Sequence, residues 1–80
     1  MKKLTFTSNV IIEAKETPNG DIFGGIRTKK YGTIGIYAKK NSELSIKQQI
    51  ENSIRELKMD GIEESGIGLL ATMIINLVKN

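Results

Sequence analysis

One stretch near the end of the chain, residues 66–78, is apolar around nearly its whole circumference when it is read as a helix. Its main apolar face comprises Ile67, Leu70, Ala71, Ile74, Leu77 and Val78. Further apolar side chains lie elsewhere on the helix, at Leu69, Met73 and Ile75. A helix of this kind is buried on more than one side. It is too short to span a bilayer, which takes about twenty residues, so we expect no membrane span.

The chain of 80 residues is the size of a single domain. A domain this small buries only about 60% of the surface of its unfolded chain, so its stability is marginal without a further constraint. The sequence contains neither Cys nor His, which removes disulfides and Cys/His metal sites from consideration. Association of several copies is then the remaining source of stability. The lack of Cys also fits a reducing compartment, and we expect a cytoplasmic protein.

Residues 3–16 alternate between apolar and polar side chains, with only Ser8 and Ile11 out of place. This period of two predicts one half-buried strand. The segment TPNGD that follows, at residues 17–21, is typical of a type I turn with a glycine bulge. Such a turn places Ile12 opposite Ile26 in the next strand.

Two more strands are predicted at residues 22–29 and 33–39, joined by a three-residue loop. In both strands the even-numbered residues carry the core face, and an odd loop length preserves that parity. The predicted register places Ile26 opposite Ile36. The first half of the chain is therefore predicted to be an antiparallel meander of three strands.

Two helices are predicted to follow the meander. Ser45 and Gln48 form a capping box at the start of the first, whose apolar stripe comprises Ile46, Ile50, Ile54 and Leu57. We expect this helix to end at Gly61 and the apolar helix to begin with Ser65 as its cap. The predicted structure is one α+β domain, residues 1–80, of order β-β-β-α-α, with both helices packed on one face of the sheet.

The residue types argue against catalysis. Without His or Cys, the chain has no Ser–His or Cys–His nucleophile and no imidazole base. Its acidic residues fall on polar helix faces or between the helices, where solvated surface is their usual role. We therefore expect a non-enzymatic protein with no metal and no cofactor.

Residues 66–71 match G-x-G-x-x-A, the dinucleotide-binding fingerprint. That motif holds a pyrophosphate at a helix N-terminus directly after a parallel strand. Here a helix and the acidic Glu63 and Glu64 come before the motif. We interpret Gly66 and Gly68 as places where the helix packs closely against a neighbour.

The outer face of the predicted meander is the main candidate for function. Residues 1–40 hold eight basic and three acidic side chains, whereas residues 41–80 hold four basic and six acidic ones. Aromatic side chains among cations on an open sheet can stack bases and hold phosphates, in either DNA or RNA. The candidate nucleic-acid-binding residues are Phe23, Arg27, Lys29, Lys30, Tyr31, Tyr37, Lys39 and Lys40.

Two other interpretations of this face stay open. In the first, the aromatic residues only support the sheet: Tyr37 covers Gly25, and Phe23 packs between lysine stems. In the second, Ile11, Phe23 and Tyr37 form a protein-binding patch of a regulator or inhibitor. The chain resembles small accessory proteins of Gram-positive phages and mobile elements in size and composition. Its element order is similar to that of arm-type DNA-binding domains of integrases.

We also expect a homodimer or higher oligomer. One sheet and one helix cannot cover every apolar side of the last helix, and the predicted register leaves the start of the first strand without a sheet partner. The candidate interface residues are Leu4, Phe6, Leu69, Met73 and Ile75.

Overall fold

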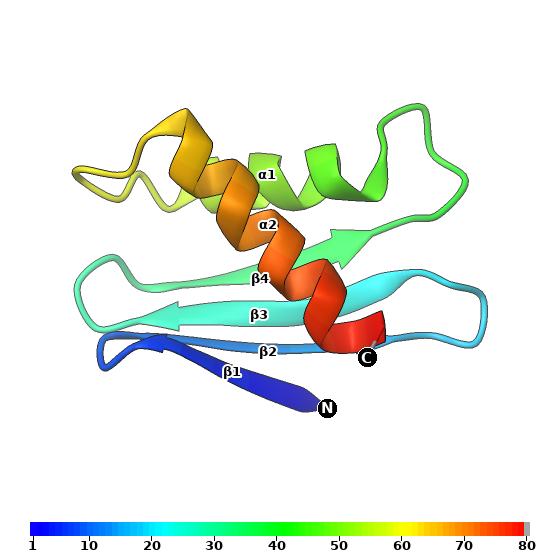
Figure 1. The fold of residues 1–80 in the computed structure, drawn as a ribbon, viewed down its shortest axis with the longest axis horizontal. Coiled ribbons are helices and arrows are strands. Elements are labelled where there is room, and N and C mark those ends of the chain that lie inside the picture. Colours follow the sequence, from blue (N-terminus) through cyan, green and yellow to red (C-terminus); the bar gives the residue numbers. More distant parts are fainter. Residues whose placement is uncertain (80) are drawn as a thin grey trace.

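The computed structural model describes residues 1–79 and has a four-stranded antiparallel sheet with two helices on one face (Figure 1). The elements in chain order are β1 (Lys2–Thr7), β2 (Val10–Glu16), β3 (Ile22–Thr28), β4 (Thr33–Ala38), α1 (Ile46–Glu56) and α2 (Glu64–Lys79). The strands are hydrogen-bonded in the order β1-β2-β3-β4. The α+β class and the two-helix layer agree with the prediction, but the sheet has four strands and not three.

The missing strand results from a hairpin inside residues 3–16. Ser8 and Asn9 form a two-residue turn between Thr7 and Val10, and the Asn9 N–H donates to Thr7 Oγ1. A two-residue turn alone would place odd residues opposite even ones. A register shift between Thr5 and Thr7 adds one residue to β1 and brings Leu4 opposite Ile12. The apolar alternation therefore continues across the turn, and the turn is hidden in the pattern.

The hairpin between β2 and β3 has the predicted register. Ile12 pairs with Ile26, and the Thr17 N–H closes the turn by donating to the Asp21 carbonyl at 2.8 Å. Gly20 takes the left-handed position, at φ 91°. The turn chemistry and the core parity thus point to the same pairing.

The predicted register between β3 and β4 is wrong by two residues. Ile26 pairs with Ile34, because five residues, 28–32, lie between the paired residues Arg27 and Thr33 in place of the predicted three-residue loop. The side chain of Thr28 holds this connection: its hydroxyl donates to the Gly32 carbonyl at 2.7 Å and accepts from the Tyr31 N–H at 2.8 Å. A shift of two keeps the same residues on the core face.

The core lies between the sheet and the two helices. Its buried side chains are Ile12, Ala14, Ile22, Ile26, Ile36, Ala38, Ile50, Ile54, Leu57, Ile67, Leu70, Ala71, Ile74 and Val78. Helix α1 packs on β4, and α2 runs obliquely over β1 and β2 (Figure 1). This arrangement leaves the opposite face of the sheet uncovered within residues 1–79.

The helix starts and ends were predicted only in part. The capping box of Ser45 and Gln48 at α1 is confirmed. However, α1 ends at Glu56, well before Gly61, and Lys58 takes a left-handed conformation because the chain turns there. Helix α2 begins at Glu64, so Ser65 lies inside it and not at its cap. In the described part of the chain, no helix combines the length and the apolar character needed to cross a membrane.

Candidate nucleic-acid interface

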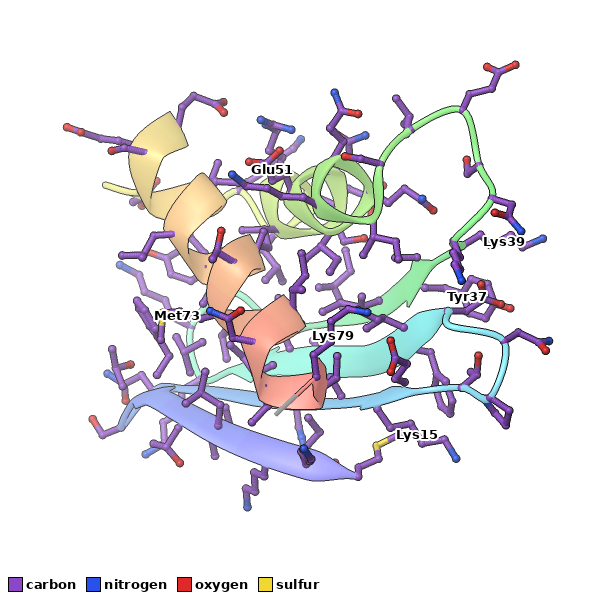
Figure 2. All side chains as sticks on the ribbon, turned by 45° about the vertical axis from the view of Figure 1, so that its right-hand side comes forward. Lys15, Tyr37, Lys39, Glu51, Met73 and Lys79 are labelled. Carbon is purple, nitrogen blue, oxygen red and sulfur yellow. The ribbon has the colours of Figure 1, made fainter. Side chains whose placement is uncertain are left out.

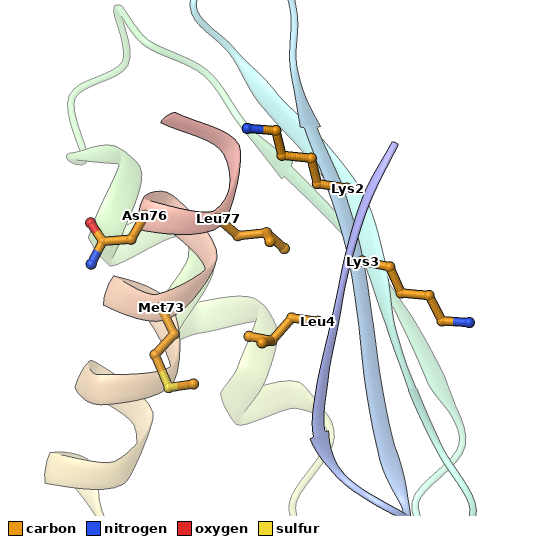
Figure 3. Close-up of a pocket in the computed structure, with 6 residues that line it drawn as sticks. All are labelled: Lys2, Lys3, Leu4, Met73, Asn76 and Leu77. Atoms are coloured by element: carbon orange, nitrogen blue, oxygen red, sulfur yellow. The ribbon is translucent and has the colours of Figure 1, made fainter. Parts of the chain in front are cut away.

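The uncovered face of the sheet carries three cross-strand rows of side chains. The pairing gives the rows Lys3–Glu13–Gly25–Gly35, Thr5–Ile11–Arg27–Thr33 and Lys15–Phe23–Tyr37. We call this surface the outer face. Figure 3 shows Lys3 pointing away from the helices, whereas Leu4 points toward α2.

The row Lys15–Phe23–Tyr37 brings two aromatic rings together. Phe23 and Tyr37 are direct cross-strand partners on β3 and β4. The Lys15 ammonium lies 5.0 Å from the centroid of the Phe23 ring, and the Lys39 ammonium lies 6.0 Å from that of Tyr37. Tyr37 is 57% exposed (Figure 2). Two rings, with a cation at either end, thus face solvent.

A bare strip of backbone lies beside these rings. Gly25 and Gly35 are direct partners, so neither strand places a side chain there. A Cβ at Gly35 would meet no atom within 4 Å, and one at Gly25 would meet only the Ile34 carbonyl oxygen, at 3.3 Å. The prediction that Tyr37 covers Gly25 is wrong, because the shifted register places Gly35 there.

Arg27 is less available than predicted. Its guanidinium donates to the Glu13 carboxylate at 2.5 Å, from a position diagonal to Glu13 on the same face. The Arg27 side chain is 62% exposed, so water competes with this pair, which is worth about 0.2–1 kcal/mol. Lys15 and Lys39 are therefore the main cations beside the rings.

The remaining predicted residues lie at the margins. Lys29, Lys30 and Tyr31 belong to the β3–β4 connection, where the Lys30 ammonium lies 5.4 Å from the Tyr31 ring centroid. Tyr31 also lines an apolar hollow with Phe6 on the helix side of β1, so it does not join the outer face. The Lys40 N–H donates to Asp21 Oδ1 at 2.9 Å and ties the β4 end to the β2–β3 turn.

Two cations of the outer face were missing from the predicted site. Lys15 was placed beside Phe23 by the predicted register but was not among the candidate residues. Lys3 was missed because β1 had been merged with β2. In the sequence, the sign of a separate first strand was the pair Ser8 and Asn9, which forms the two-residue turn.

The glycines of the G-x-G-x-x-A segment lie in the first turns of α2 and not after a strand. A Cβ at Gly68 would lie 3.3 Å from a carboxylate oxygen of Glu51 on α1. Close helix packing therefore accounts for this glycine. Within residues 1–79, no group of three or more acidic, His or Cys side chains is placed to hold a metal ion.

Arg55 and Glu64 join the two helices away from the outer face, through a 2.6 Å contact between Nη2 and Oε2. The hydrogen bond from Arg55 lowers the pKa of Glu64 below its ordinary value, and the same bond raises the pKa of Arg55. Both side chains are exposed, so water competes with this ion pair.

Four of the five predicted interface residues line hollows between β1 and α2, and Ile75 does not. Leu4 and Met73 line one hollow between β1 and α2, and Phe6 and Leu69 line a second one further along the same elements. Ile75 is half-buried against the core and follows Gly68 by seven residues, which places it on the flank of α2 that faces α1.

Comparison with protein-family models, with curated proteins and with solved structures finds no match to this chain. The case for function therefore depends on the geometry of its own residues.

Proposed function

We propose that this chain is a non-enzymatic binding protein whose outer face holds single-stranded nucleic acid. The observation that carries the proposal is the Phe23–Tyr37 pair, flanked by Lys15 and Lys39, on a sheet face that neither helix covers. Bases stack on aromatic side chains whatever their sequence, and cations hold the phosphates between them.

The balance of contacts favours the replacement of a lysine ammonium by a base on an aromatic ring. Stacking one base on an aromatic ring is worth about 1–3 kcal/mol. An exposed cation–π contact, such as that of Lys39 with Tyr37, is worth about 0.5–1 kcal/mol. A base that displaces the ammonium from the ring therefore gains free energy. The released ammonium sits on a flexible four-carbon stem and is then available to a phosphate.

The glycine strip adds space for the ligand. Gly25 and Gly35 expose flat backbone next to the two rings, and a sugar or a base edge can approach it closely. On the far side of this strip, Arg27 can exchange Glu13 for a phosphate at small cost, because their exposed pair is weak. Glu13 remains as an opposing charge, so we expect Arg27 to contribute less than Lys39.

The test is a titration of labelled single- and double-stranded oligonucleotides at several salt concentrations. Lys39→Ala should weaken binding of every sequence and reduce the salt slope by about 0.7–1, the value for one phosphate contact. Lys47→Ala, which removes the same charge from α1, is the matched control and should change neither quantity.

Tyr37→Ala separates stacking from sheet support. If the ring stacks a base, this variant should bind single strands about five- to 150-fold more weakly, with an unchanged salt slope. If the ring only supports the sheet, the melting temperature should fall and binding should stay the same. A parent protein that binds neither oligonucleotide at roughly 100 μM, the weak end of the non-specific range, would end the proposal.

A protein-directed regulator or inhibitor is the second candidate. On the outer face, the row that contains Glu13 and Gly25 separates Ile11 from Phe23, so these side chains do not form one continuous apolar patch. The observation that favours this candidate lies on the other side of the sheet, where Phe6 and Leu69 are 40% and 59% exposed. An apolar partner surface does not give the steep salt dependence of a phosphate contact, so the same titration distinguishes the two.

A further inference from the structure

The helix side of β1 has an apolar trough that the side chains of residues 1–79 do not fill. At one end, a hollow of about 600 Å³ is lined by Lys2, Lys3, Leu4, Met73, Asn76 and Leu77. At the other end, a hollow of about 270 Å³ has Phe6, Asp60 and Leu69 among its lining residues. Figure 3 shows Leu4 and Leu77 facing each other across the space between β1 and α2.

The trough exists because α2 has more apolar sides than the core can cover. Its buried face rests on the sheet, while Leu69, Met73 and Leu77, spaced four apart, form a second stripe along its flank. β1 is an edge strand, so no further strand continues the sheet below this stripe. Leu69 is left 59% exposed beside Phe6, which is 40% exposed.

The two ends of the trough differ in charge. Lys2 lies at the end where β1 begins and α2 finishes, near the N and C labels of Figure 1, whereas the side chain of the neighbouring Lys3 points to the outer face. Asp60 lies at the opposite end, and the exposed Glu63 follows it just before α2 begins. A partner that fits this surface should therefore be apolar along its middle, acidic at one end and basic at the other.

A second copy of the same chain has these properties. A two-fold rotation about an axis perpendicular to the sheet turns the trough end for end, so the basic end of each copy meets the acidic end of the other. Such an interface is isologous and closes at two subunits. The rotation also sets the two α2 helices antiparallel, which is favourable for their dipoles.

We propose that the trough between β1 and α2 is a dimer interface, in which the Leu69–Met73–Leu77 stripes and the Leu4 and Phe6 side chains of two copies pack together. Side chains and not backbone pairing make the contact, because lysines and the register shift of β1 are features that prevent strand addition at sheet edges. The two outer faces then point to the same side of the dimer. The proposal itself does not depend on nucleic-acid binding.

Sedimentation of the full chain at micromolar concentration, without nucleic acid, tests this interface. The parent should sediment as a dimer. Leu69→Asp should raise the dimer dissociation constant by at least about tenfold, because it places an unpaired charge within the apolar contact. Leu44→Asp is the matched control: Leu44 is 43% exposed, lies in the β4–α1 connection and should leave the dimer intact. Circular dichroism verifies that both variants are folded.

A charge reversal tests the antiparallel arrangement. Asp60→Lys should weaken association, because like charges then meet at both ends of the interface. Adding Lys2→Glu to the same chain should restore it, which a merely structural role of Asp60 would not produce. A monomeric parent, an oligomer larger than two, a dimer that resists Leu69→Asp, or a double variant no tighter than Asp60→Lys would each overturn the proposal. None of these results bears on the oligonucleotide titration.

Discussion

Truncation of Ile26 tests whether the core is assembled by the pairing described above. Ile26 is fully buried at the centre of the sheet, with Ile12 opposite it on β2 and Ile34 opposite it on β4. Ile26→Ala removes three carbon atoms, and their transfer alone is worth about 2.4 kcal/mol at about 0.8 kcal/mol each. The cavity left behind adds to this, so we expect a loss of about 2–5 kcal/mol in the free energy of unfolding.

That loss is large for a chain of this size. Domains have about 0.05–0.15 kcal/mol of stability per residue, which is about 4–12 kcal/mol for 80 residues. Urea unfolding followed by circular dichroism, at one fixed protein concentration, measures the change. Ile11→Ala is the control, because Ile11 is a half-buried isoleucine on the outer face of the neighbouring strand. Equal shifts of the two urea midpoints would refute the assignment of Ile26 to the core.

Two further predictions concern the backbone. Gly24→Ala should strongly destabilise the fold, because a Cβ there would lie 1.9 Å from the Glu13 carbonyl oxygen. In contrast, a Cβ at Gly35 would meet no atom within 4 Å, so Gly35→Ala should leave the melting temperature nearly unchanged. Ser45→Ala should lower the free energy of unfolding by about 0.5–2 kcal/mol, because it removes the acceptor for the Gln48 N–H at the start of α1. Thermal and urea unfolding measure both effects.

The parts of the fold that follow from local chemistry were predictable. The TPNGD turn determines its own register, so the pairing of Ile12 with Ile26 could be derived from residues 17–21. The capping box and the apolar stripe of α1 are equally local, since they depend on residues three and four apart. The core parity of the strands was also predicted, because a side chain's face depends only on odd or even position.

The errors arose where the apolar alternation does not distinguish between two paths of the backbone. The turn at Ser8 and Asn9 reverses the parity and the register shift in β1 restores it, so the alternation of residues 3–16 looks like one strand. In the β3–β4 connection, three- and five-residue loops have the same parity. The Thr28 hydroxyl selects the longer one through bonds that the hydrophobic pattern does not contain.

These errors altered the candidate site in specific ways. The two-residue shift moved Tyr37 from Gly25 to Phe23, which created an adjacent ring pair that the predicted register lacked. The additional strand brought Lys3 onto the outer face and gave Leu4 a sheet partner. It also formed the trough between β1 and α2, whose shape depends on the oblique path of the helix.

Chemical-shift mapping is the most direct test of the outer face as a nucleic-acid interface. A short single-stranded oligonucleotide is added to isotope-labelled protein, and the backbone amide signals are followed by NMR. We expect the largest shifts at Phe23, Gly25, Gly35 and Tyr37, with the signals of α1 unchanged. The glycine amides give the clearest readout, because no side chain separates them from the ligand. Shifts confined to the helices, or no shifts at a saturating oligonucleotide concentration, would contradict the proposal.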